Sequence, residues 1–362
     1  MKQRVMGFDV ARALAIFGMV IVNFKITMNA DTGNSLLIWF SGLFEGRASA
    51  LFVILAGIGI TFLTNKARES LDKKIILQSR LLIIKRGLLL VAIGLLYTPI
   101  WEADILHFYG FYFLIAATIF TVNNKILLAI ASFIVLIFPL FMLFFNYEQN
   151  WNWSTLVYEN FWSLDGMTRH IVFNGFHPIF PWSAFLIFGM WLGRQDLSKT
   201  LIRKRLLIGS LITWIITEST FYFIRAIVGD GSAIEMTSQE VIFLFSTSII
   251  PPLPQYMISA GSSAVIILIG SLYFSEKFSQ SNINKWLYQT GQLSLTLYVA
   301  HVIIGMGLLE SLGRLNNQTI DFSLFSALLF CIFGVGLSVI WLKYFKIGPL
   351  EWVLRKVVNT YI

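Results

Sequence analysis

The chain has few of the charged residues that a soluble protein carries on its surface. Only 13% of its 362 residues are charged, against roughly 25% in ordinary soluble domains. Hydrophobic residues make up 57% of the chain and include 33 Phe. Since so little polar surface cannot cover a chain of this length in water, the composition predicts an integral membrane protein.

Cysteine is nearly absent, because the chain has only Cys331, which lies inside an apolar run. This excludes an internal disulfide and a metal site built from cysteines. The formal net charge of +8 would suit nucleic acid only if the basic residues formed a soluble face. They cluster between apolar runs instead, so no nucleic-acid binding is expected. No cleavable signal is expected either, since Met1–Arg12 leads into an apolar run too long for one.

Ten apolar runs are candidates to cross the membrane. A helix needs roughly 20 mostly apolar residues to span about 30 Å of hydrocarbon, and continuous runs argue against barrel strands, which alternate. The runs are 8–25, 47–64, 80–99, 106–121, 126–146, 177–193, 206–228, 252–274, 291–309 and 323–342. The prediction is an all-α, polytopic membrane helix bundle with about ten transmembrane helices. It forms one domain, 1–362, with five helices in 1–146, an outer loop at 147–176 and five helices in 177–362.

The distribution of charge orients these runs. With the N-terminus inside, 22 of the 27 Lys and Arg fall in inner segments, and 13 of the 19 acidic residues fall in outer ones. Basic residues favour the cytoplasmic side, so both termini are expected there. Two shorter apolar stretches, Ser35–Phe44 and Val241–Ile250, indicate interfacial or re-entrant segments. A multi-pass protein of a bacterial cytoplasmic membrane fits these loops and the lack of a eukaryotic targeting segment.

Three of the four histidines map to the outer side. His107 opens one run within Ala103–Gly110, His177 opens another within Asn174–Trp182, and His170 lies seven residues earlier. Histidine suits proton transfer near neutral pH, and a neighbouring carboxylate fixes its tautomer. The carboxylates on that side include Asp104, Asp165 and Glu45. A structural role for each histidine stays open. Their spacing matches no zinc pattern, so no metal is expected.

Ionisable residues inside apolar runs are costly and need a partner or water. Asp9 and Arg12 are three residues apart on one helical face, which indicates either an ion pair or a functional site. Lys85 and Arg86 either extend to the inner interface or join Arg12 and Arg80 in a cationic mouth for a phosphate-bearing ligand. His301 lies near mid-membrane and is expected to point into the bundle, toward a pathway or a neighbouring helix.

Glycine pairs recur at helix-packing distance within the predicted runs. They are Gly57 with Gly59, Gly87 with Gly94, and Gly334 with Gly336. Small residues of this kind let helices approach closely. We expect them to serve packing and not chemistry.

The first run, Gly7–Asn23 (GFDVARALAIFGMVIVN), resembles the opening of a superfamily of transmembrane acyltransferases. Its members include the heparan-α-glucosaminide N-acetyltransferase-like proteins and the bacterial proteins of domain-of-unknown-function class 418. Further similar segments follow in order at Phe52–Gly59, Asp104–Gly110, Asn174–Arg194, Ser294–Tyr298 and Gly348–Arg355. The resemblance therefore covers nearly the whole chain.

The resemblance implies transfer of an acyl group, most simply acetyl, from cytoplasmic acyl-CoA to an amine or hydroxyl of a sugar or glycan outside. In the lysosomal members, an Asn that ends the first helix and a His in the next loop are implicated in catalysis. Asn23 matches that Asn, whereas Lys25–Arg47 contains no His.

The hypothesis is that His177, or otherwise His107, acts as the general base, with Asp104 available to orient it. Asn23 would hydrogen-bond the developing oxyanion. The candidates to bind the CoA phosphates are Arg12, Arg80, Lys85 and Arg86. The candidates to bind the acceptor are Asn174, Trp182, Arg47, Glu45 and His170.

Two other functions stay open as hypotheses. A transporter or flippase would use His301, Glu218 and the Asp9–Arg12 pair as a translocation path; the lack of symmetry between the two halves argues against it. A non-catalytic membrane partner that organises envelope enzymes is the third reading. The lipid bilayer is a certain partner on any of them, and a homo-oligomer stays open.

Overall fold

The computed structural model describes residues 5–70, 72–153, 155–229 and 236–359. These residues are helical, apart from loops and two short antiparallel strands, β1 (Trp151–Asn152) and β2 (Val157–Tyr158). The chain forms two compact units. Unit 1 comprises Met1–Phe52 with Ser263–Thr360, and unit 2 comprises Val53–Ser262.

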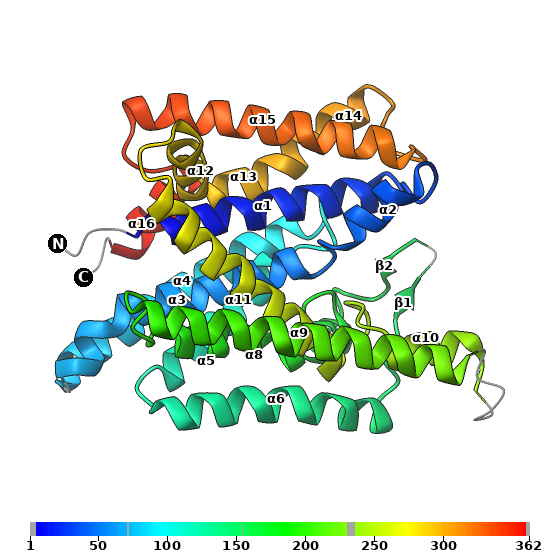
Figure 1. The fold of residues 1–362 in the computed structure, drawn as a ribbon, viewed down its shortest axis with the longest axis horizontal. Coiled ribbons are helices and arrows are strands. Elements are labelled where there is room, and N and C mark those ends of the chain that lie inside the picture. Colours follow the sequence, from blue (N-terminus) through cyan, green and yellow to red (C-terminus); the bar gives the residue numbers. More distant parts are fainter. Residues whose placement is uncertain (1–4, 71, 154, 230–235, 360–362) are drawn as a thin grey trace. The chain divides into compact units, whose positions relative to one another are not determined.

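Unit 1 is built around the first helix of the chain. Its complete elements are α1 (Met6–Thr27), α2 (Ser35–Gly42), α12 (Asn282–Gln292), α13 (Ser294–Ala300), the π-helical segment η3 (His301–Met306), α14 (Gly307–Ser311), α15 (Ile320–Tyr344) and α16 (Pro349–Asn359). Helix α1 packs against α12, α13 and α15 (Figure 1). The contact with α12 is close, because a Cβ on Gly291 would lie 1.8 Å from the Asp9 carbonyl oxygen.

Unit 2 includes the described residues of the loop 147–176, which the sequence predicts as the outer loop. Its complete elements are α4 (Lys73–Tyr97), α5 (Leu106–Ile119), α6 (Asn124–Phe144), α7 (Leu164–Arg169), the π-helical segment η1 (His170–Asn174), α8 (Ile179–Leu192), α9 (Thr200–Val228) and α10 (Ser238–Phe245), together with β1 and β2. Helices α3 (Arg47–Ser70) and α11 (Pro254–Lys277) contribute to both units.

Glycine brings two helix pairs of unit 2 into backbone contact. Helices α4 and α5 form a hairpin in which a Cβ on Gly94 would lie 2.2 Å from the His107 nitrogen. Helices α3 and α8 meet where a Cβ on Gly57 would lie 2.0 Å from the Leu186 carbonyl oxygen. The predicted packing role therefore holds for these glycines, whereas Gly59 and Gly336 face open space.

Seven helical stretches of the described residues are long and apolar enough to cross a membrane. Leu164–Asn174 and Ile179–Leu192, which meet at a 49° bend, count as an eighth if they form one span. Length and composition therefore identify fewer candidate spans than the ten that the sequence predicts. The run 80–99 forms α4, which carries three basic residues in its apolar part, and the run 106–121 forms α5, which has only 14 residues.

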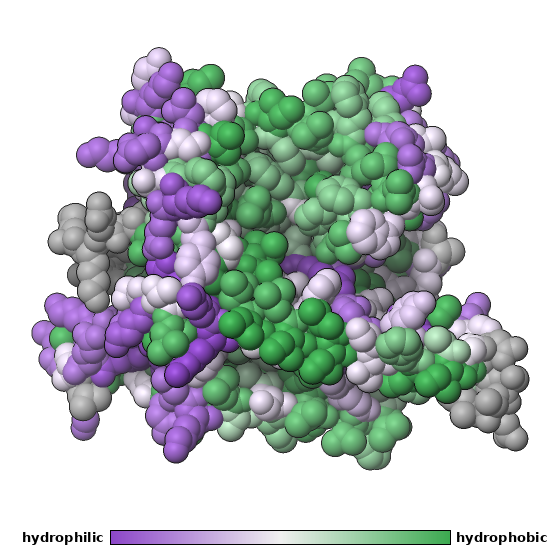
Figure 2. All heavy atoms as spheres, in the orientation of Figure 1, coloured by the Kyte–Doolittle hydropathy of each residue, from purple (hydrophilic) through white to green (hydrophobic). Residues whose placement is uncertain are grey.

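The exposed side chains fit lipid as their surroundings. Helix α9 exposes Ile208, Ile212, Ile215, Ile216, Tyr222, Phe223 and Ile227. In Figure 2 hydrophobic atoms gather over the middle of this helix, and hydrophilic atoms gather at its start. So large an apolar surface is a liability in water but is the expected exterior of a membrane helix.

Candidate active site

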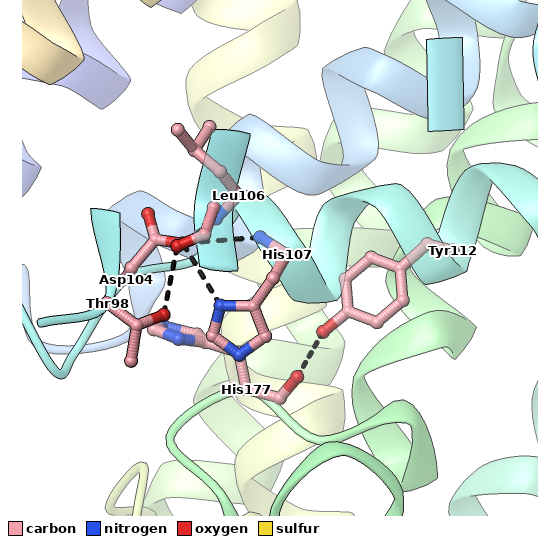
Figure 3. Close-up of polar contacts among 7 residues, drawn as sticks. Thr98, Asp104, Leu106, His107, Tyr112 and His177 are labelled. Atoms are coloured by element: carbon pink, nitrogen blue, oxygen red, sulfur yellow. Dashed lines mark hydrogen bonds and ion pairs between the residues drawn. The ribbon is translucent and has the colours of Figure 1, made fainter. Parts of the chain in front are cut away.

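Asp104 and His107 form the centre of the candidate site, at the turn between α4 and α5. Asp104 Oδ2 accepts hydrogen bonds from the backbone nitrogens of Leu106 at 2.9 Å and His107 at 3.2 Å. The same oxygen lies 3.1 Å from His107 Nδ1 (Figure 3). A carboxylate suits the start of a helix, where backbone N–H groups lack partners and the helix dipole is positive.

This geometry favours one tautomer of the neutral His107 ring. A carboxylate can only accept, so Nδ1 carries the proton, and in the neutral imidazole Nε2 then presents its lone pair. Among the described residues Nε2 is buried and has no hydrogen-bond partner. A buried imidazole with a free lone pair and a carboxylate behind it is the arrangement of a general base.

His170 and His177 lie next to His107, as their predicted common depth suggests. The rings of His107 and His170 are stacked with centroids 5.9 Å apart. The ring of Phe108 lies 5.2 Å from that of His170 and 6.0 Å from that of His177. Within the described residues, Nδ1 of His170 and Nδ1 of His177 also lack hydrogen-bond partners.

An aromatic wall encloses the three imidazoles. The side chains that contact them include Phe108, Trp151, Tyr158, Phe161 and Trp182. His107 is 0% exposed, His170 1% and His177 7%. A reaction at His107 Nε2 therefore requires part of this wall to move, and the His177 side is the least covered.

The segment that carries His177 is tied to α5. Tyr112 donates its hydroxyl proton to the His177 carbonyl oxygen at 2.5 Å (Figure 3), and the Trp182 ring packs edge-on against the His177 imidazole at 4.5 Å. Pro178 stands immediately before α8, as expected from a proline at a helix start. His177 is thus held at the mouth of a helix, as predicted.

Asn174 organises the outer loop. Its Nδ2 donates to the carbonyl oxygens of Tyr147 at 2.8 Å and Gln149 at 2.9 Å, and its Oδ1 accepts from the Tyr158 hydroxyl at 2.9 Å. Its own carbonyl oxygen accepts from Trp151 Nε1 at 2.6 Å. Because both ends of the amide are engaged inside the protein, its contacts are structural.

We expect Asn174→Ala to destabilise unit 2 while leaving the imidazoles chemically intact. The change leaves several buried groups unpaired, each at a cost of about 1–3 kcal/mol. The melting midpoint of the purified protein should fall by several degrees, whereas Asn282→Ala at the exposed start of α12 should leave it unchanged. Equal midpoints for the two variants would contradict this role.

Glu102 also helps to hold the loops around the site, although the sequence does not indicate it. Its Oε2 accepts from the Tyr158 backbone nitrogen at 3.2 Å, which links the α4–α5 loop to β2. Burial raises the pKa of Glu102, and the bond from Tyr158 offsets part of that rise. Tyr112 and Tyr158 were missed as well, because an aromatic residue in an aromatic-rich chain carries no distinguishing pattern.

Asn23 lies in unit 1, paired with His301. Asn23 Nδ2 is 2.9 Å from His301 Nε2, and His301 Nδ1 contacts the Tyr298 carbonyl oxygen. Since that carbonyl can only accept, Nδ1 holds the proton and Nε2 accepts from the amide. His301 is buried, which confirms that it points inward and selects the hydrogen bond to a neighbouring helix.

The remaining predicted residues are divided between the units. In unit 1, Glu45 accepts from Lys25 Nζ at 2.8 Å, Arg47 begins α3, and Arg12 forms an ion pair with Asp9. In unit 2, Arg80, Lys85 and Arg86 are half-buried on α4. No group of three His, Cys, Asp or Glu in the described part of the chain is placed to hold a metal ion.

Comparison with protein families decides the affiliation. The family described as heparan-alpha-glucosaminide N-acetyltransferase, catalytic, matches residues 4–225. The chain belongs to this N-acetyltransferase family. Its match includes Asn23, Asp104 and all three clustered histidines, and membership implies acetyltransferase activity in a multi-pass membrane protein.

A second family covers the other end of the chain. It is described as a protein of unknown function, DUF418, and matches residues 190–361, so the segment with His301 lies in this match and beyond that of the N-acetyltransferase family. A comparison with curated proteins gave no match.

Proposed function

We propose that the protein transfers an acyl group, most simply acetyl, from cytoplasmic acyl-CoA to an amine or hydroxyl of an extracytoplasmic sugar or glycan. The observation that carries the proposal is the Asp104–His107 pair, whose free Nε2 is suited to deprotonate an acceptor. Family membership supports the reaction class and acetyl-CoA as the donor. The bias of Lys and Arg toward the inner segments supports cytoplasmic termini and a bacterial cytoplasmic membrane.

In the proposed reaction His107 Nε2 takes the proton of the acceptor amine or hydroxyl. The acceptor atom attacks the thioester carbonyl, the carbon–sulfur bond breaks, and the CoA thiolate leaves and takes the proton from the imidazolium. Asp104 remains ionised, holds Nδ1–H and stabilises the imidazolium between the two proton transfers.

His107 is the better candidate of the two histidines that the sequence proposes as base. It has Asp104 within hydrogen-bond distance of Nδ1, whereas the His177 ring contacts the aromatic rings of Trp182 and Phe108. A carboxylate behind the ring both orients a base and raises its basicity. We assign His177 and His170 to the wall that the acceptor contacts, together with Trp182.

Asn23 stays the residue that the sequence predicts as a hydrogen-bond donor to an oxyanion. Within unit 1, His301 accepts one of its two Nδ2 protons, which orients the amide. Glu45 and Arg47 in unit 1 stay candidates for acceptor hydroxyls. Arg80, Lys85 and Arg86 stay candidates for the donor, whereas Arg12 is occupied by Asp9.

The proposal is tested with purified protein in lipid nanodiscs, given acetyl-CoA labelled in the acetyl group and a panel of amino sugars and neutral sugars. We expect labelled acetyl-sugar and one free CoA thiol for each acetyl group transferred. Empty nanodiscs and reactions without acceptor provide the background. No transfer to any acceptor, with movement of an unmodified sugar across proteoliposomes, would replace the proposal by the transporter.

A further inference from the structure

Two arginines of unit 2 converge on the C-terminal end of α5. Arg80 Nε donates to the Ala117 carbonyl oxygen at 3.0 Å, and its guanidinium lies 5.8 Å from the centre of the Phe120 ring. Arg194, just after α8, donates from Nη2 to the Phe120 carbonyl oxygen at 2.8 Å and from Nη1 to that of Val122 at 2.6 Å. The two guanidiniums therefore bind carbonyls within two turns of one another.

Arg68 is brought to the same place by the contact of α3 with α8. Thr61 Oγ1 donates to the Met190 carbonyl oxygen at 2.8 Å, and a Cβ on Gly193 would meet Ile58 and Thr61 at 3.0 Å. From this contact α3 continues to Arg68, and the segment that follows α8 continues to Arg194. Burial and then the charge of Arg68 lower the pKa of Arg194 to about 10, so the two cations lie close enough to repel.

The positive charge of these three side chains is poorly compensated. No carboxylate of the described residues forms an ion pair with Arg68, Arg80 or Arg194. Arg68 Nη2 donates to Asn65 Oδ1, and Asn65 Nδ2 binds Glu69, whose charge acts on Arg68 from there. The carbonyls at a helix end supply only partial negative charge.

Unused donors point to a ligand at this cluster. Within the described residues, the Nε atoms of Arg68 and Arg194 are buried without hydrogen-bond partners, although all three side chains are only half-buried overall. Half-buried cations repel one another, and an anion that accepts hydrogen bonds from their unpaired N–H groups stabilises them. The planar fork of Arg matches the oxygens of phosphate.

We infer that Arg68, Arg80 and Arg194 form a site for a phosphate-bearing ligand, the nucleotide end of acyl-CoA. The identity of the ligand rests on the proposed function. All three residues belong to the segments that the charge pattern places inside, where acyl-CoA is supplied. Only Arg80 was among the donor-binding residues predicted from the sequence; Arg68 and Arg194 are new.

The test measures binding of adenosine 3′,5′-bisphosphate to the full-length protein by calorimetry, in nanodiscs of neutral lipid. Arg68→Gln is the principal variant, because Arg68 bonds to Asn65 in its own helix and its loss should leave the fold intact. We expect at least a tenfold loss of affinity, a smaller loss for Arg68→Lys, and less than a twofold change for the control Arg205→Gln, which removes an exposed charge of α9.

Unchanged affinity in Arg68→Gln and in Arg194→Gln would overturn the inference. A second arm repeats the titration in nanodiscs containing phosphatidylglycerol. If the arginines govern retention of this lipid while the bisphosphate fails to bind, the site recognises headgroups and the donor assignment falls. Bisphosphate binding through the arginines without acyl transfer would overturn the proposed function alone, and transfer with unchanged bisphosphate affinity in the variants would overturn this inference alone.

Discussion

Replacing His107 by Ala should lower the rate of acyl transfer by about a thousandfold, within the range of 10²–10⁴ that a positioned base contributes. The variant removes the Nε2 lone pair that Asp104 orients, and no other imidazole nitrogen of the cluster is paired with a carboxylate in the described structure. Single-turnover release of CoA thiol measures the effect directly, because it reports the chemical step separately from product release.

Two companion variants separate His107 from its neighbours. Asp104→Asn keeps the shape of the site but loses the acceptor for Nδ1–H, so we expect a loss of at least tenfold. His177→Ala keeps the base and opens the wall, so its rate should fall less than that of His107→Ala. A full rate in His107→Ala with loss of activity in His177→Ala would return the role of base to His177.

Gly94→Ala should abolish most activity although it replaces no polar side chain. The added Cβ would lie 2.2 Å from the His107 nitrogen, 2.7 Å from its Cα and 2.8 Å from Asp104 Oδ2, so α4 and α5 must separate. Overpacking of this kind costs about 1–3 kcal/mol or more, and a 1 Å displacement of a catalytic group can cost about a hundredfold in rate.

Transfer rate and melting midpoint together check the Gly94→Ala prediction. We expect at least a hundredfold loss of rate and a lower midpoint. Gly209→Ala provides the matched control, because a Cβ there meets open space on α9, and its rate and midpoint should stay at the wild-type values. A Gly94→Ala protein with the wild-type rate would show that the close approach of α4 and α5 does not position the site.

The clustering of the histidines was predictable from the sequence. His107 and His177 each stand where an apolar run begins, and His170 lies seven residues before His177, so the runs themselves indicate that the three share one end of the bundle. Pro178 at the start of α8 was predictable for the same local reason, since a helix start tolerates the missing N–H. Each of these inferences needs only a residue and its neighbours.

Contacts between segments far apart in the sequence could not be predicted from local patterns. Asn23 and His301 are 278 positions apart, and nothing in the spacing of either segment selects the other. The sequence gives no sign that Arg194 differs from the other basic residues of the predicted inner segments. Its partners at the end of α5 are backbone carbonyls, which no side-chain pattern marks. Fewer spans pass the length and composition criterion than the sequence predicts, because an apolar run does not reveal that α5 ends after 14 residues.

Helix α5 joins the two proposed halves of the chemistry. His107 lies in its first turn, and Phe120, whose carbonyl oxygen binds Arg194, caps its other end. Thirteen residues at 1.5 Å each separate them by about 20 Å along the helix axis. The length of α5 therefore sets the reach that the donor needs. A donor whose phosphates are bound at one end of the helix presents its thioester to His107 only if its flexible arm covers that length.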